Sequence, residues 1–94
     1  MAIKSFRDKR TQAVFNGENP KGVSTTLARQ ALRKLRLLDQ AHAVRDLRSP
    51  PGNRLEALSG DRVGQHSIRV NDQYRICFRW EDSDAHEVEL VDYH

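Results

Sequence analysis

The sequence is poor in the residue patterns that define several large classes of protein. A single cysteine among 94 residues rules out an intramolecular disulfide and is typical of a reducing compartment. No stretch approaches the roughly 20 consecutive apolar residues that cross a bilayer, and the first residues contain no apolar run typical of a secretory signal. We therefore expect a soluble cytoplasmic protein that does not bind a membrane.

Signatures of nucleotide, metal and acyl-transfer sites are also missing. Neither of the glycine-rich motifs that bind nucleotide phosphates occurs. The four histidines do not have the spacing of metal ligands, and one cysteine cannot build a zinc ribbon. There is no Gly-x-Ser-x-Gly motif and no cysteine–histidine pattern for a nucleophile. The chemistry that remains is acid–base catalysis without a metal ion or a cofactor.

Charge is abundant and unevenly distributed. The net charge is +3, but residues 1–50 contain eleven Lys or Arg against four Asp or Glu, whereas residues 51–94 contain five against nine. A basic first half suggests attraction to nucleic acid or to an acidic partner. An ordinary solvated helical surface would have the same composition.

Helical and strand patterns divide the chain near residue 54. Asp8 and Ser24 are typical N-caps for a short helix ending near Asn16 and a long helix over about residues 25–43. The long helix carries an apolar stripe at helical spacing, formed by Ala28, Ala31, Leu32, Leu35, Leu38 and Ala41. Another face of the same helix is lined by Arg29, Arg33 and Arg36.

Short strands bounded by turn residues occupy most of the remaining sequence. After a first strand over residues 2–6, we expect a β-meander whose strands span residues 54–58, 63–70, 74–81 and 87–93. Pro50-Pro51-Gly52 lies in the connector before the meander, because proline disrupts both helices and central strands. The sequence thus predicts one domain over residues 1–94, of the α+β class, with two N-terminal helices packed on an antiparallel β-sheet.

Two of these strands place different chemistry on their two faces. If residues 66–70 and 74–80 pair as a hairpin, the large apolar side chains and His66 share one face. The other face carries Ser67, Arg69, Arg75, Cys77 and Arg79. Three fixed cations beside a strand that ends in Asp92-Tyr93-His94 indicate a site for a phosphodiester. The simpler alternative is a set of surface arginines on an exposed sheet face.

RNA cleavage through the 2′-hydroxyl needs a base, an acid, and cations that stabilise charge on the phosphorus oxygens. Arginine suits the last role because its planar fork matches phosphate oxygens. His94 can act as acid or base near neutral pH, Asp92 can act as base or orient His94, and Tyr93 can donate a proton or stack on a base. Because strand sides alternate, Asp92 and His94 share one side and Tyr93 the other. The order of the three roles stays open.

Several separated segments resemble the HigB branch of the RelE/ParE toxin superfamily, and most closely its GraT-like plasmid maintenance killer group. They occur in the family's order, and they are residues 3–6, 52–62, 64–70, 71–75 and 91–94. The resemblance implies a RelE-like fold of the microbial-ribonuclease type. It also implies a toxin of a type II toxin–antitoxin system, a ribosome-dependent mRNA endoribonuclease (mRNA interferase) that inhibits translation. The partner implied is a HigA-like helix-turn-helix antitoxin, in a complex that binds operator DNA.

The resemblance also implies roles for particular residues. Basic positions that hold the scissile region correspond to Arg62, Arg69 and Arg75. The terminal catalytic cluster corresponds to Asp92, Tyr93 and His94. Where relatives have a histidine and a lysine on the first strand of the meander, this chain has Glu56 and Ser59. Glu56 could replace the histidine as general base, whereas Ser59 removes one cation.

The predicted site falls into three groups of residues. The candidate catalytic residues are Arg75, Asp92, Tyr93, His94 and Glu56. The candidate RNA contacts are Arg54, Arg62, Arg69 and Arg79, and the candidate ribosome contacts are Arg29, Arg33 and Arg36. Two other functions stay open on the same fold. One is a ParE-like inhibitor of DNA gyrase, which has no need of acid–base groups at the terminus, and the other is a non-catalytic nucleic-acid-binding module.

Overall fold

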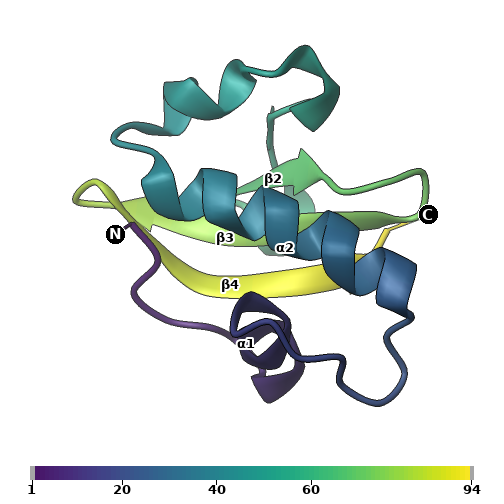
Figure 1. Ribbon diagram of the computed structural model, residues 1–94. Helices are drawn as coiled ribbons and strands as arrows, with labels where there is room; N and C mark the ends of the chain where they lie inside the picture. Colours follow the sequence, from purple (N-terminus) through teal and green to yellow (C-terminus); the bar gives the residue numbers. More distant parts are fainter. Residues whose placement is uncertain (1, 94) are drawn as a thin grey trace.

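The computed structural model describes residues 2–93 and places two α-helices across one face of an antiparallel sheet (Figure 1). α1 spans Lys9–Phe15 and α2 spans Thr25–Gln40. Both expected N-caps form, because the Thr11 N–H donates to Asp8 Oδ1 (2.7 Å) and the Leu27 N–H donates to Ser24 Oγ (3.1 Å). Among the described residues, no helix has the length and apolar character needed to cross a membrane.

α2 ends at Gln40, three residues earlier than the expected end at residue 43. The next residue, Ala41, is extended, with φ −71° and ψ 141°. The backbone N–H groups of His42 and Ala43 then donate to Asp46 Oδ2, at 2.9 and 3.1 Å. These bonds cap a short 3₁₀ helix over Val44–Arg48, so the amides that would have extended α2 begin a new turn instead.

The sheet has the order β1-β2-β3-β4, and each neighbouring pair is antiparallel. Its strands are β1 (Glu56–Ala57), β2 (Gln65–Arg69), β3 (Tyr74–Glu81) and β4 (Asp84–Asp92). In the β2–β3 hairpin Ile68 lies opposite Ile76 and Arg69 lies opposite Arg75. This register confirms the predicted alternation of apolar and arginine-bearing faces. The predicted α+β class is also confirmed.

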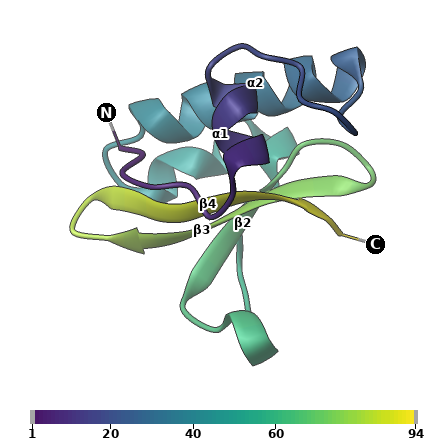
Figure 2. The same ribbon diagram turned by 90° about the horizontal axis from the view of Figure 1, so that it is seen from below.

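The hydrophobic core lies between the helices and the apolar face of the sheet. Its most buried side chains are Val14, Ala31, Leu35, Leu38, Leu47, Ile68, Ile76, Phe78, Ala85, Val88 and Leu90. Full burial of one such large apolar side chain contributes about 1.5–3 kcal/mol. Figure 2 shows α1 and α2 on this side of the sheet, and the chain between β1 and β2 projecting from the other side. Neither α-helix of the described chain packs on the arginine-bearing face. The 3₁₀ helix Gly60–Arg62 reaches over part of it instead, and Arg62 bonds there to Glu89 of β4 (3.3 Å).

Several strand boundaries differ from the sequence prediction because left-handed residues interrupt the extended backbone. β1 is shorter than the expected strand over residues 54–58, since Arg54 has φ 44°. β2 begins only after Gly64, which has φ 91°. β4 begins earlier than expected because Asp82 and Ser83, with φ 53° and 67°, form the tight two-residue turn of the β3–β4 hairpin.

The first residues do not form the expected strand over residues 2–6. They make two isolated parallel bridges to β4, one between Ile3 and Ala85 and the other between Phe6 and Val88. Between these bridges β4 is distorted at Glu87, which has φ 53° and whose N–H donates to Ser5 Oγ (2.9 Å). A continuous ladder cannot form across this irregular position.

The connector from α2 to β1 is organised around one buried amide. Asn53 ends a second 3₁₀ helix, Pro51–Asn53, and its side chain is fully buried. Its Nδ2 donates to the carbonyls of Leu47 (3.1 Å) and Ser49 (3.3 Å), and its Oδ1 accepts from Lys34 Nζ on α2. This anchoring brings the next residue, Arg54, to the edge of the arginine-bearing face.

Candidate functional site

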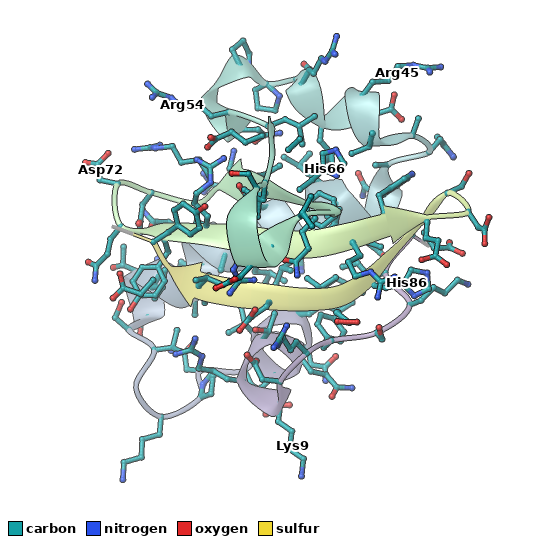
Figure 3. The ribbon with its side chains drawn as sticks, turned by 180° about the vertical axis from the view of Figure 1, so that it is seen from behind. Lys9, Arg45, Arg54, His66, Asp72 and His86 are labelled. Carbon is teal, nitrogen blue, oxygen red and sulfur yellow. The ribbon has the colours of Figure 1, made fainter. Side chains whose placement is uncertain are left out.

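A cavity of about 250 Å³ opens at one end of the sheet, beside the β2–β3 turn. It is lined by Arg54, Glu56, Arg69, Asn71, Asp72, Arg75 and Tyr93. Figure 3 shows the labelled Arg54 and Asp72 at this end of the sheet and His86 toward the other end. With three arginines and two carboxylates, the lining carries a formal excess of one positive charge. Residues from the connector, β1, β2, β3 and the end of β4 thus meet in one place.

Arg75 is the most constrained side chain of the cavity and only 8% exposed. Its Nε donates to Ser67 Oγ (2.7 Å), and its Nη2 donates to the carbonyls of Ser67 (3.4 Å) and Arg54. The same nitrogen forms an ion pair with Glu56 Oε1 (3.1 Å). These partners compensate for burying a charge. Arg75 is therefore a cation in a fixed orientation, rather than the surface arginine of the simpler alternative.

Tyr93 lies against Arg75 on the same side of the sheet, as strand alternation predicts. The Arg75 Cζ lies 5.9 Å from the centroid of the Tyr93 ring, in the range of a cation–π contact. Tyr93 is 41% exposed, so its ring and phenol are accessible to a ligand bound in the cavity. The contact joins the residue that follows β4 to the start of β3.

Arg69, another arginine of the cavity, is held less firmly than Arg75. Arg69 forms an ion pair with Asp72 in the β2–β3 turn. The side chain of Asp72 is fully exposed and that of Glu56 is 57% exposed, so both carboxylates can rotate into solvent. An incoming anion can replace them on Arg69 and Arg75. The cavity can therefore bind a phosphate group by exchanging one anion for another.

Of the predicted terminal cluster, Asp92 is described by the structure and is not part of the cavity lining. Asp92 lies opposite Tyr74 in the β3–β4 register, and its Oδ2 accepts from Gln73 Nε2 (3.0 Å). It therefore lies beside the cavity, on the other side of the strand from Tyr93. His94 lies outside the described residues.

Arg62 and Arg79 do not line the cavity either. Arg79 bonds to Glu81 (3.0 Å) and Glu87 (3.2 Å), toward the β3–β4 turn. Arg62 bonds to Glu89 (3.3 Å). The expected set of three cations on one hairpin face is thus divided, because Arg79 lies opposite Gln65, at the other end of the β2–β3 pair from Arg69 and Arg75. There it is paired with acidic residues of β3 and β4.

Cys77 separates the two groups of arginines along β3. Its side chain is fully buried, and burial, the largest influence, raises the pKa of the thiol. The group therefore stays protonated and uncharged at neutral pH. Cys77 is thus a small buried side chain and not a reactive thiol.

The predicted ribosome contacts form a separate surface on α2. Arg29, Arg33 and Arg36 are exposed, and with Leu32, Leu37 and Gln40 they line a shallow groove of about 420 Å³. Within residues 2–93 none of the three arginines forms an ion pair. Their charge is therefore not neutralised by neighbouring carboxylates of the described chain.

The residues that shape the cavity from behind were not identified from the sequence. Ser67 lies on the predicted face and directly opposite Cys77, but its side chain accepts a hydrogen bond from Arg75, two residues along β3. Strand alternation alone does not specify this diagonal contact. Asn71 lines the cavity, and its Oδ1 accepts from the N–H groups of Gln73 and Tyr74, both at 2.8 Å. The Asn-Asp pair of the turn is the sequence signal that could have identified Asn71, since asparagine side chains stabilise such turns.

Comparisons with known proteins agree on one family. The family described as the RelE-like toxin of the type II toxin–antitoxin system HigB matches residues 4–94. Toxin HigB-1 of Vibrio cholerae is 44% identical over 86 residues, which cover 90% of each chain. Endoribonuclease HigB of Proteus vulgaris is 32% identical over 92 residues, covering 98% of this chain and 99% of the relative.

The fold is also similar to a solved structure. A chain of the YoeB–YefM complex from Staphylococcus aureus superposes with a TM-score of 0.61, covering 100% of this chain and 99% of the other. The sequences are 14% identical, so this likeness concerns the fold alone.

Proposed function

This chain belongs to the RelE-like HigB toxins of type II toxin–antitoxin systems, and on that premise we propose that it inhibits translation as a metal-independent endoribonuclease that cuts mRNA on the ribosome. One relative is named an endoribonuclease. The observation that carries the proposal is the guanidinium of Arg75, held by Ser67 and Arg54 in a cavity with two further arginines. Such a preorganised cation suits the charge that develops on a phosphate during cleavage.

In the proposed reaction the 2′-hydroxyl oxygen attacks the neighbouring phosphorus. A base takes the hydroxyl proton, a new P–O bond forms, and the bond to the 5′ oxygen breaks as an acid protonates it. Arg75 faces the non-bridging oxygens, and Arg54 and Arg69 add positive charge. As the phosphate arrives, Asp72 leaves Arg69 and the Glu56 carboxylate turns from Arg75 toward the 2′-hydroxyl of the bound RNA. The exposure of both side chains supports such movements.

Glu56 is the base that the cavity favours, because its carboxylate lies beside Arg75 and can reach a group bound there. Tyr93 is positioned to stack on a base or to donate its phenol proton. Asp92 and His94 remain acid–base candidates from the sequence. We assign the acid role to this terminal group without ordering its members.

We further propose that Arg29, Arg33 and Arg36 dock the toxin on the ribosome through phosphates of ribosomal RNA. Their position on an exposed face of α2, without ion pairs inside the described chain, supports this role. In this proposal the ribosome supplies the positioning of the mRNA that a small cavity cannot supply alone. Arg62 and Arg79 are assigned to the RNA backbone nearby.

As a toxin of a type II system, the protein has an antitoxin as its partner. We propose that this antitoxin is a HigA-like helix-turn-helix protein and that the complex binds operator DNA. The proposed place of action is the cytoplasm, where mRNA and ribosomes meet.

Sequencing of RNA 5′ ends after a short pulse of expression tests the proposal. We expect new ends inside translated regions of mRNA, absent when Arg75→Ala is expressed. Purified toxin should then cut mRNA on programmed ribosomes and leave the same mRNA largely intact without them. Growth arrest with DNA breaks and unchanged RNA ends would instead indicate a gyrase inhibitor.

A further inference from the structure

Two side chains behind the cavity link α2 to Arg75 and have no part in the proposed reaction. Lys34 lies on α2, and its Nζ donates to Oδ1 of Asn53 in the connector. Asn53 is fully buried, and its amide also bonds to the carbonyls of Leu47 and Ser49. The end of the connector is thus fixed back to the helix through a side-chain hydrogen bond between residues 19 positions apart in sequence.

The residue that follows Asn53 depends on this anchoring. Arg54 has φ 44°, a left-handed conformation that side chains other than glycine rarely adopt. Such a conformation persists only where its surroundings hold it. In this conformation the Arg54 carbonyl accepts a hydrogen bond from Arg75 Nη2. The position of Asn53 therefore affects the Arg75 guanidinium through the direction in which the Arg54 carbonyl points.

We propose that Lys34 and Asn53 are positioning residues of the candidate site, which fix the Arg54 carbonyl and through it the guanidinium of Arg75. That Arg75 takes part in RNA cleavage is taken from the proposed function, and this inference rests on it. The contacts are continuous. The Lys34 ammonium bonds to the Asn53 amide, Asn53 is followed directly by Arg54, and the Arg54 carbonyl accepts from the Arg75 guanidinium. Neither Lys34 nor Asn53 lines the cavity, so both act through Arg75 rather than on the substrate.

The environment of Lys34 is unfavourable for a charged side chain, which indicates that its bond to Asn53 is the reason for a lysine here. Burial, followed by the charges of Arg33 and Arg69, lowers the pKa of its ammonium below the ordinary value for lysine. A positive charge is thus disfavoured at this position, and an apolar side chain would avoid that cost. The bond to Asn53 is the interaction that the amine provides and an apolar side chain cannot provide.

The test compares the full-length chain with Lys34→Met, which keeps the length of the side chain but removes its donor. Lys34→Gln keeps a neutral donor, and Lys21→Met makes the same chemical change on an exposed loop residue as a control. Two quantities are measured: the single-turnover cleavage rate on programmed ribosomes at saturating toxin, and hydrogen exchange of the Arg75 guanidinium N–H groups by NMR, including Nη2, which donates to the Arg54 carbonyl. Lys34→Ala is the second variant should Lys34→Met not fold.

We expect Lys34→Met to slow cleavage about 10- to 100-fold, the size of effect that a displaced catalytic group produces, with ribosome affinity little changed. Exchange of the Arg75 guanidinium N–H groups should become faster in the same variant. Lys34→Gln should restore most of the rate, and Lys21→Met should match the native chain. Unchanged exchange at Arg75 in Lys34→Met would overturn the proposal. If the native chain cuts no RNA, the proposed function fails, while the exchange measurement still decides the positioning role.

Discussion

The carboxylate of Glu56 and the guanidinium of Arg75 form an ion pair at 3.1 Å that spans three strands. Glu56 is on β1 and Arg75 on β3, and Ser67 of the intervening β2 lies opposite Glu56 and bonds to Arg75. The carboxylate therefore occupies a position on the guanidinium that a phosphate would use. The ion pair gives separate predictions for the two residues.

Replacing Arg75 by alanine should abolish growth inhibition. The loss of a preorganised cation should raise the cleavage barrier on the order of 2–4 kcal/mol. Single-turnover cleavage on programmed ribosomes measures this effect, and binding to the antitoxin checks that the variant folds. Arg45→Ala, at an exposed position on a 3₁₀ helix, is the matched control. A folded Arg75→Ala protein with native toxicity would contradict the assignment.

Replacing Glu56 by glutamine should separate binding from chemistry. Cleavage should slow by about 10²–10⁴-fold if Glu56 is the base, whereas binding to mRNA-programmed ribosomes should tighten, because a neutral amide competes less with phosphate for Arg75. Affinity and single-turnover rate are measured in parallel, with Glu18→Gln in an exposed loop as control. A native rate with tighter binding would make Glu56 a competitor for the phosphate site and not a base.

Two substitutions of Tyr93 distinguish stacking from proton donation. Tyr93→Phe keeps the ring that contacts Arg75 but removes the hydroxyl, and Tyr93→Ala removes both. If the ring stacks on a base, Tyr93→Phe should cut at nearly the native rate and Tyr93→Ala should bind RNA about 1–3 kcal/mol more weakly. If the phenol is the acid, both variants should be equally slow in the chemical step.

His94→Ala tests the terminal acid–base group predicted from the sequence. Loss of one such group typically costs about 10²–10⁴-fold in rate. Cleavage by His94→Ala should fall within that range and should lose the limb of its pH–rate profile that belongs to the imidazole. A variant with the native rate and profile would assign the chemistry to Glu56 and Tyr93.

Charge reversal on α2 tests the proposed ribosome contact. With Arg29, Arg33 and Arg36 changed to glutamate, binding to ribosomes should fall and its dependence on salt should weaken, since fewer phosphates are neutralised. The melting temperature should change little because all three side chains are exposed. Native ribosome affinity in this triple variant would rule out the α2 groove as the contact.

Sequence patterns correctly predicted the helix starts and the hairpin, because both depend on residues that are close together in the sequence. Asp8 and Ser24 identify the helix starts because a capping side chain acts within its own turn. The hairpin of β2 and β3 could be aligned because shifting its register by one residue would bury Arg69 and Arg75 in the core. These features place the arginines on the correct face.

The site itself depends on contacts between residues distant in sequence. The left-handed Arg54 follows from the burial of Asn53 and its bond to Lys34, which no local pattern contains. The pairing of Arg79 with Glu87 requires the distortion of β4 at Glu87. Alternation along the strand predicted the separation of Asp92 from Tyr93, but the bond between Asp92 and Gln73 came only from the structure.

The exposed carboxylates of the cavity act as built-in counterions. Arg69 and Arg75 are already neutralised by Asp72 and Glu56, so a phosphate that enters displaces these carboxylates instead of dissolved ions. Affinity at the cavity should therefore depend on salt less steeply than its three arginines alone would suggest. A polyanion that binds without a defined orientation gains little binding free energy when it replaces one carboxylate partner of an arginine by another anion. The phosphate that gains most is one that reaches Arg75 in the orientation fixed by Ser67 and Arg54.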